Sequence, residues 1–153
     1  MKEINALKRI LFCTDFSASA DAAFGYACGI ARASGGRIVA MHVVTSTYED
    51  PEYVSFVTPA LRMQVDDAIR GRVERELQER YTAFCPADTP CEVLVVKGKP
   101  AEKILDVAVR EEIDLIVMGS RGQTAMGHLF LGSVAHRVGH SSRVPVLLVP
   151  AAS

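Results

Sequence analysis

Short, continuously apolar runs alternate along this chain with stretches whose apolar residues recur at helical spacing. A run that is apolar without alternation is typical of a parallel strand covered on both faces. Such runs predict strands at 8–14, 37–44, 91–96, 114–118 and 144–149, and helices between them at 19–34, 61–84, 101–112 and 133–142. This β-α-β-α-β-α-β-α-β order predicts an α/β fold: a doubly wound, five-stranded parallel sheet with helices on both faces.

Local signals set the expected ends of these elements. Ser17 is expected to cap the first helix, and Gly35 and Gly36 to end it. From Leu61 to Phe84 we expect one long amphipathic helix that turns a single apolar face to the sheet. The polar stretch 45–59 is expected to be a loop, either a cover for a site or partner surface or a plain surface loop.

Size and charge restrict the function classes. The 153 residues suit a single domain spanning 1–153, and 49% are hydrophobic against 23% charged. A net charge of −1 gives no electrostatic reason to expect binding to nucleic acid or to an acidic membrane surface. No apolar run approaches the roughly 20 residues of a membrane-spanning helix. With no signal-peptide pattern either, we expect a cytoplasmic protein whose four cysteines are reduced.

A glycine-punctuated loop follows the predicted strand 114–118. Gly119 and Gly122 lie in this loop, and Gly132 and Ser133 begin the next helix. Helix N-termini carry backbone N–H groups without partners and favour phosphate oxygens, and glycines here permit unusual dihedral angles and close approach to a ligand. The alternative is that the glycines are turn residues and Ser133 an ordinary N-cap. The spacing alone leaves both interpretations open.

The expected topology adds a second polar segment to this loop. In open α/β sheets, ligands bind outside the carboxyl ends of the strands where the strand order reverses. Thr14 and Asp15 follow the first strand, so they meet the glycine loop if the first and fourth strands are neighbours. Two common nucleotide motifs are absent: the chain has no GxG, and neither of its GxxxxG spacings continues with the lysine of a P-loop.

The spacing Gly-x2-Gly-x9-Gly-Ser, from Gly119 to Ser133, is similar to that of the universal stress protein family, in the branch that binds ATP. The resemblance covers essentially the whole chain and includes the segments 14–17, 42–44, 98–101, 118–122, 131–134 and 144–149. It implies a sheet of order 3-2-1-4-5. It also implies a homodimer joined through the edge strand 144–149.

The resemblance implies ATP as the ligand, with Mg²⁺ or Mn²⁺. Asp15 would serve the ribose or bind the metal ion. The adenine pocket would be lined by Val43 and the backbone around Cys13 and Thr14. Met118 and Gly119 would pass beneath the nucleoside, and the phosphates would be held by Gly122, Gly132, Ser133 and Val134. Arg121 is a candidate for a phosphate or subunit contact, and His128 for a phosphate neighbour.

Other side chains leave alternatives open. Cys13 stands where the family often has a proline or a small residue, and its thiol is either an inert core group or an oxidisable one. His136 and His140 have the spacing of metal ligands, but no third ligand is evident.

The expected function is therefore that of an ATP-binding stress-response regulator. We expect at most slow hydrolysis or self-phosphorylation, and a downstream partner that the sequence does not identify. A nucleotide-free dimeric interaction module is one alternative, although the intact glycine motif counts against it. An enzyme that splits ATP to release pyrophosphate is another, although the absence of glycine from 14–17 counts against it.

Overall fold

A computed structural model gives the fold of residues 6–45, 55–123 and 130–151. The strands are β1 (Arg9–Cys13), β2 (Arg37–Val44), β3 (Cys91–Lys97), β4 (Leu115–Gly119) and β5 (Val146–Val149). The helices are α1 (Ala18–Ser34), α3 (Pro59–Arg80), α4 (Pro100–Arg110) and α5 (Ser133–Ser141), with a 3₁₀ turn, η2, at Thr82–Phe84. Most of the expected loop 45–59 lies outside the described residues. The candidate His128 lies outside them as well.

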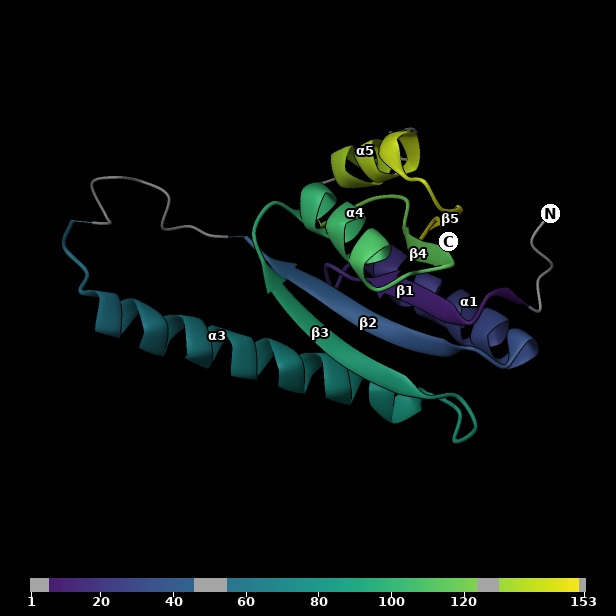
Figure 1. The fold of residues 1–153 in the computed structure, drawn as a ribbon, viewed down its shortest axis with the longest axis horizontal. Helices are drawn as coiled ribbons and strands as arrows, with labels where there is room; N and C mark the ends of the chain where they lie inside the picture. The colour runs from purple at the N-terminus through teal and green to yellow at the C-terminus, as the bar shows by residue number, and fades with distance from the viewer. Residues whose placement is uncertain (1–5, 46–54, 124–129, 152–153) are drawn as a thin grey trace.

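The strands form one parallel sheet of order β3-β2-β1-β4-β5, which confirms the predicted topology (Figure 1). β1 lies at the centre, and the chain order reverses on its two sides. Cys13, the last residue of β1, pairs with Met41 of β2 on one side and Met118 of β4 on the other. The carboxyl ends of the first and fourth strands are therefore neighbours.

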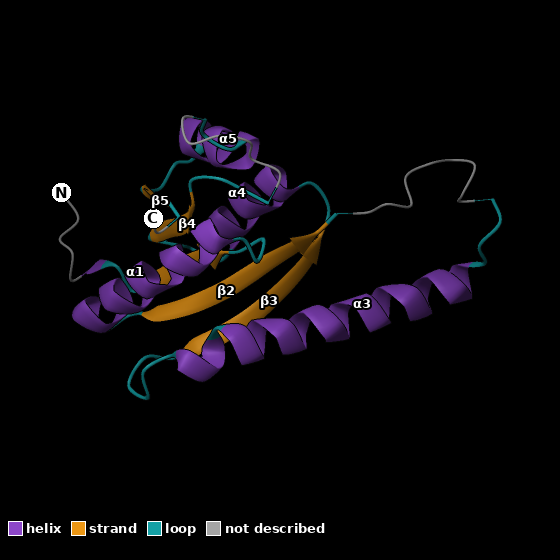
Figure 2. Cartoon of the chain, turned by 180° about the vertical axis from the view of Figure 1, so that it is seen from behind, coloured by secondary structure: helices purple, strands orange, loops and turns teal. Residues whose placement is uncertain are grey.

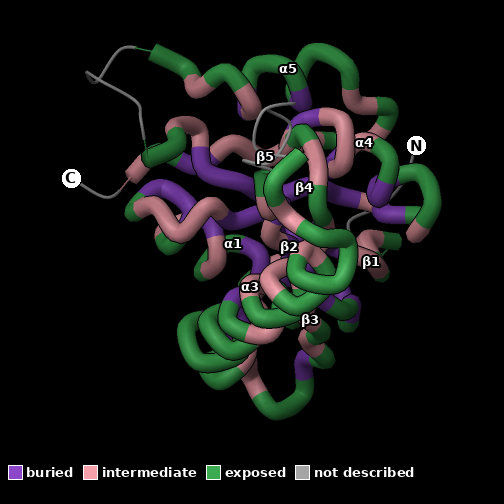
Figure 3. Tube along the Cα trace, turned by 90° about the vertical axis from the view of Figure 1, so that its left-hand side faces the viewer, coloured by how far each residue is buried: buried purple, intermediate pink, exposed green. Residues whose placement is uncertain are grey.

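Two helical layers cover the sheet, α1 and α3 on one face and α4 and α5 on the other (Figure 2). Successive residues of a strand point to opposite faces. Ile10 and Phe12 of β1 accordingly join the core beneath α1 and α3, while Leu11 and Cys13 join the core beneath α4 and α5. The central strands are buried on both sides, as their apolar sequences predict (Figure 3).

Helix α1 is capped by the predicted residues and ends where predicted, although it starts at Ala18, one residue before the predicted range. The side chain of Ser17 caps it by accepting a hydrogen bond from the N–H of Ala20 at 3.2 Å. Gly35 ends it in the left-handed conformation, with φ of 61°, where glycine avoids the strain of a side chain. Small side chains let the helix lie close to the sheet, and three of them are fully buried: Ala23, Ala27 and Ala31.

Helix α3 departs from the prediction of one continuous apolar face. The helix ends at Arg80, and within it only Val73 and Leu77 are buried. Its 22 residues span about 33 Å at 1.5 Å per residue. The seven residues of β3 beneath it span only about 23 Å. The first turns of α3 therefore extend beyond the sheet (Figure 1), and Leu61 and Met63 are 48% and 67% exposed.

The last strand is shorter than predicted. β5 starts at Val146, because Pro145 has no N–H to donate, although its carbonyl accepts a hydrogen bond from the N–H of Ile116 at 3.0 Å. In the described parts of the chain, no helix is both long and apolar enough to cross a membrane.

The difference between the two ends of α3 predicts different costs for the same substitution. Leu77→Ala removes a side chain that is 0% exposed and should lower the free energy of unfolding by about 2–5 kcal/mol. Leu61→Ala, on the overhanging end of the same helix, should change it by no more than about 0.5 kcal/mol. Urea unfolding followed by circular dichroism measures both. Equal losses would contradict the overhang.

Candidate functional site

A cavity of about 580 Å³ opens where the carboxyl ends of β1, β2 and β4 meet the first residues of α4 and α5. Its volume lies within the range of small-molecule binding sites. Apart from the candidate His128, which lies outside the described residues, the residues predicted for the site all line it: Cys13, Thr14, Asp15, Val43, Met118, Gly119, Arg121, Gly122, Gly132, Ser133 and Val134. The structure thus brings these eleven residues together, and their binding roles stay predictions.

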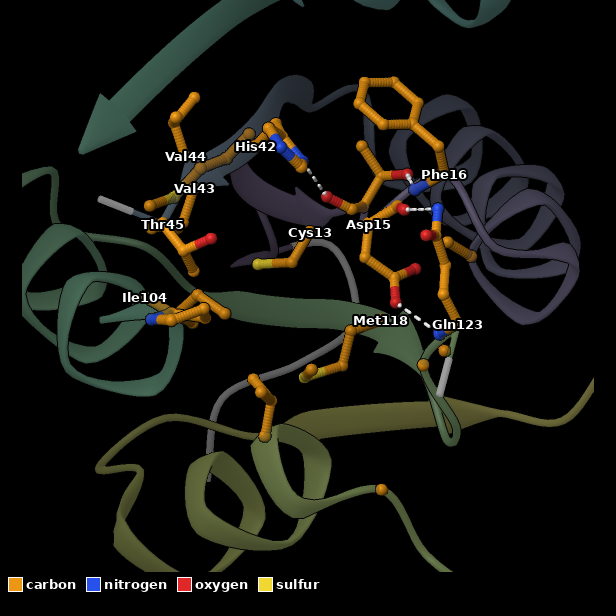
Figure 4. A pocket seen from close by; sticks show the side chains of 18 of the residues that line it. Cys13, Asp15, Phe16, His42, Val43, Val44, Thr45, Ile104, Met118 and Gln123 are labelled. Carbon is orange, nitrogen blue, oxygen red and sulfur yellow. Dashed lines mark hydrogen bonds between the residues drawn. The ribbon is translucent and has the colours of Figure 1, made fainter. Parts of the chain in front are cut away.

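One side of the cavity is apolar. Cys13, Val43, Ile104 and Met118 surround the same space, and Figure 4 shows them arranged around it. All four are buried members of the core beneath α4 and α5. Burial raises the pKa of the Cys13 thiol far above its ordinary value, which keeps it protonated and favours the inert-thiol alternative. A flat apolar group can therefore contact this side without meeting a charge.

Asp15 links the end of β1 to the glycine loop through hydrogen bonds. Its Oδ1 accepts a hydrogen bond from the N–H of Ser17 at 3.0 Å, and its Oδ2 accepts one from the N–H of Gln123 at 3.1 Å. The Gln123 side chain donates back to the carbonyl oxygen of Asp15 at 2.6 Å (Figure 4). An ionised carboxylate offers about four acceptor positions, so these bonds leave capacity for a ligand hydroxyl or a cation.

The three glycines of the motif allow close approach between protein segments. A Cβ on Gly119 would lie 2.6 Å from Ser19 Oγ and 2.9 Å from the backbone nitrogen of Ala20. One on Gly122 would lie 2.8 Å from Asp15 Oδ2, and one on Gly132 would lie 3.3 Å from the Cα of Arg121. The expectation of unusual dihedral angles at Gly119 and Gly122 is wrong, because the positive-φ glycines of the described chain are Gly35 and Gly98.

The first turn of α5 presents backbone donors to the cavity. Gly132 is the N-cap and has no side chain to cap with, so the alternative of Ser133 as an N-cap is wrong. The first intrahelical bond runs from the N–H of His136 to the carbonyl of Gly132 at 2.8 Å. The N–H groups of Ser133, Val134 and Ala135 therefore have no acceptor within the helix, and all three residues line the cavity. This end of the cavity suits an anion.

Tyr81, Thr14 and Asp21 form a hydrogen-bonded group that the sequence did not predict. It lies at the end of β1, and Tyr81 belongs to the core beneath α1 and α3. The Tyr81 hydroxyl lies 2.7 Å from Thr14 Oγ1 and donates to Asp21 Oδ1, also at 2.7 Å. Burial, followed by the bond to Asp21, raises the pKa of Tyr81, so the phenol keeps its proton. Burial opposes ionisation of Asp21, but hydrogen bonds from Arg80 and Tyr81 hold its pKa below the usual value.

The rings of Phe16 and His42 line the cavity and contact each other. Phe16 is one of two non-glycine residues of the described chain with positive φ, at 63°. Its ring lies 4.8 Å from that of His42 and within 5.7 Å of the Arg80 guanidinium. His42 Nδ1 donates to the Thr14 carbonyl at 2.8 Å (Figure 4). No role was predicted for Arg80 from the sequence, and Tyr81 was predicted only as part of the apolar face of the helix expected at 61–84.

The described residues offer no preformed metal centre. They contain no group of three or more histidine, cysteine or acidic side chains placed to bind a metal ion together. The rings of His136 and His140 stack with centroids 6.3 Å apart on α5. Any divalent cation at Asp15 would need most of its ligands from water or from a bound phosphate, as Mg²⁺ commonly does.

Comparison with known proteins places the chain in a family. The model of the universal stress protein family matches residues 6–150. A universal stress protein from Thermus aquaticus, named for its place in the QAH/OAS sulfhydrylase 3′ region, is 38% identical over 144 residues, covering 93% of this chain and 98% of that protein. The chain therefore belongs to the universal stress protein family.

Solved structures agree with this assignment. The structure of MJ0577, a universal stress protein of Methanocaldococcus jannaschii, superposes with a TM-score of 0.74 at 26% identity, covering 96% of this chain and 98% of the other. A universal stress protein solved in complex with cAMP superposes with a TM-score of 0.65 at 25% identity, covering 95% and 98%.

The contact at Gly119 predicts a large difference between two glycine-to-alanine substitutions. Gly119→Ala forces a methyl group against the backbone of α1, which cannot move aside cheaply, and should cost about 1–3 kcal/mol of stability. Gly29→Ala lies within α1 with no atom inside 4 Å and should add about 0.5–1 kcal/mol. Thermal unfolding of both variants checks this. A neutral Gly119→Ala would contradict the close approach.

Proposed function

We propose that this protein is a dimeric regulator that binds ATP together with Mg²⁺ or Mn²⁺. One observation carries the proposal: a single cavity joins an apolar side, made by Cys13, Val43, Ile104 and Met118, to the uncapped first turn of α5. An adenine ring needs the first surface and phosphates need the second. The two lie within one space of about 580 Å³.

The proposed roles follow the position of each residue. The Asp15 carboxylate accepts hydrogen bonds from the N–H groups of Ser17 and Gln123 and keeps other acceptor positions. With these it would accept a ribose hydroxyl or bind the cation. The phosphates would lie against the backbone at the start of α5 and beside the side chain of Arg121. The residues proposed for them are Gly122, Gly132, Ser133 and Val134.

The family supports an adenine nucleotide as the class of ligand. A relative at 25% identity was solved with cAMP, which carries an adenine and one phosphate. The triphosphate is the finer step of the proposal. It rests on the Gly-x2-Gly-x9-Gly-Ser spacing, which is similar to that of the ATP-binding branch of the family, and the backbone donors at the start of α5 are compatible with it.

Binding, rather than rapid turnover, is the proposed activity. Asp15 accepts hydrogen bonds from two backbone N–H groups, and the role proposed for its remaining acceptor positions is to bind a ribose hydroxyl or a cation rather than to transfer a proton. At most, slow hydrolysis or self-phosphorylation would accompany binding. A downstream protein would respond to the nucleotide-bound dimer in the cytoplasm, where thiols such as the four free cysteines stay reduced.

Titration calorimetry with unlabelled ATP, with and without Mg²⁺, tests the ligand. The wild type should bind saturably, and more tightly with Mg²⁺. Gly122→Ala should weaken binding about tenfold or more, because its methyl group displaces Asp15 and the loop that orients the phosphate donors. Gly29→Ala is the matched control and should bind as the wild type does. No saturable binding by the wild type would refute the proposal, and normal binding by Gly122→Ala would assign the phosphates to another loop.

The proposed dimer rests on the edge strand. β5 pairs with β4 on one side and is the last strand of the sheet. The N–H of Ile116 donates to Pro145 and that of Ser120 to Val149, so the backbone groups of Val146 and Leu148 point away from β4. An apolar strand with such groups invites pairing with a second copy.

Light scattering after size-exclusion chromatography should give twice the mass of one chain at micromolar concentration. Val146→Lys should shift the protein toward monomer, because a lysine on an edge strand opposes pairing. The control, Leu61→Lys, lies on α3 at the opposite side of the sheet and should stay dimeric. A monomeric wild type would refute the dimer.

A further inference from the structure

The segment that joins β1 to α1 carries Asp15 to the cavity through an unusual backbone conformation. Phe16, the residue after Asp15, has φ of 63°, in the left-handed region that residues with a side chain adopt only at an energetic cost. Ser17 follows, and its N–H donates to Asp15 Oδ1 at 3.0 Å. The direction of the Asp15 carboxylate therefore depends on the conformation of Phe16, and a costly conformation persists only where surrounding contacts fix it.

Side chains hold both backbone polar groups of Phe16. Its N–H donates to Thr14 Oγ1 at 2.9 Å (Figure 4), and its carbonyl accepts from the Arg80 guanidinium at 3.1 Å. The same guanidinium lies over the Phe16 ring, 5.7 Å from its centroid. Because His42 Nδ1 also donates to the Thr14 carbonyl at 2.8 Å, bonds on either side of Asp15 fix the backbone that carries it.

The donors of the Tyr81–Thr14–Asp21 group have a fixed order. Arg80 donates to both carboxylate oxygens of Asp21, at 3.0 Å and 2.6 Å, and an ionised carboxylate can only accept. The Tyr81 hydroxyl therefore gives its proton to Asp21 Oδ1, 2.7 Å away. The Thr14 hydroxyl, 2.7 Å from the Tyr81 oxygen, must then donate to it, which leaves the Thr14 lone pairs to accept the N–H of Phe16.

Packing fixes the Tyr81 ring independently of its hydroxyl. The residue is 2% exposed, and the ring centroids of Phe12 and Phe24 lie 4.9 Å and 5.0 Å from its own. A phenylalanine at this position would keep these ring contacts and lose only the hydroxyl. Tyr81 does not itself line the cavity, so its hydroxyl can act on a ligand only through Thr14 and the segment that follows it.

We propose that Tyr81 is a positioning residue for the ligand site. Its hydroxyl fixes the side chain of Thr14, Thr14 fixes the backbone of Phe16, and that backbone aims the Asp15 carboxylate at the cavity. The effect on ATP rests on the proposed function, in which Asp15 contacts the nucleotide or its cation. Removing the Tyr81 hydroxyl should then weaken ATP binding without removing any group that touches ATP.

The buried hydroxyl of Thr14 transmits the change. Thr14 is 6% exposed, and without the Tyr81 oxygen its hydroxyl has lost its acceptor. A buried donor without a partner is costly, so the segment shifts to find another one. That shift weakens the bond that supports Phe16, and it moves Asp15 Oδ2 away from the Gln123 nitrogen, which lies 3.1 Å from it in the structure.

Nuclear magnetic resonance of the ligand-free, full-length protein tests the positioning directly. The reporters are the N–H groups of Ser17 and Gln123, which both donate to the Asp15 carboxylate. In Tyr81→Phe their proton resonances should move upfield, as expected when a hydrogen bond weakens. The matched control is Tyr26→Phe, which removes the hydroxyl of a tyrosine that is 58% exposed on α1, and it should move neither resonance. Unmoved resonances in Tyr81→Phe would overturn the proposal.

Titration with ATP and Mg²⁺ measures the consequence for binding. Tyr81→Phe should bind ATP about three- to tenfold more weakly than the wild type, the effect expected from one hydrogen bond. Tyr26→Phe should bind ATP as the wild type does. Circular dichroism confirms that both variants are folded. Wild-type affinity in Tyr81→Phe would overturn the proposal.

A double-mutant cycle separates positioning from general stabilisation. Asp15→Asn removes the charge that Tyr81 is proposed to position, so adding Tyr81→Phe to it should weaken ATP binding no further. A second loss as large as that in the wild-type background would show that Tyr81 acts by another route, and would overturn the proposal. A wild type that does not bind ATP would refute the proposed function instead, and the resonances of Ser17 and Gln123 then decide the positioning of Asp15 by themselves.

Discussion

The pairing of β1 with β4 is the interaction on which the rest of this structure depends. It reverses the chain order at the centre of the sheet and sets Cys13 beside Met118. Asp15 and Gln123, more than a hundred positions apart in sequence, then lie within hydrogen-bonding distance. A shift of one residue in this register would turn every side chain of β1 to the other face and separate the two polar strand ends.

The same pairing explains why the glycine motif both supports the fold and lines the cavity. Where β4 ends, Gly119 passes so close to α1 that no side chain fits, and Ser19 fixes the contact by donating to the Val149 carbonyl at 2.7 Å. The Gly132 N–H donates to the Ser120 carbonyl at 2.8 Å, which brings the start of α5 against the end of β4. The glycines therefore build the cavity by letting its walls meet, and the donors of α5 face it as a result.

Sequence patterns predicted most of this arrangement, but by different routes. The apolar runs predicted the strands, with β2 found at the predicted residues, and the strand order followed from the family resemblance. The Tyr81–Thr14–Asp21 group escaped prediction because Tyr81 lies 67 positions from Thr14 and reads as an ordinary core residue. The overhang of α3 was missed because helical spacing does not record the length of the strand beneath it. Gln123 was missed because the hydrogen-bond partner of a polar loop residue depends on which distant segment the fold places beside it.

The residue that follows the last turn of α3 lies against the end of β1 that borders the cavity. Tyr81 ends this helix and contacts Thr14, the neighbour of Asp15 in the cavity. Its ring also packs on Phe12 and Phe24, with centroids 4.9 Å and 5.0 Å away. Because interiors this closely packed deform little, the position of Tyr81 bears on that of Thr14 and so on the end of β1 that borders the cavity.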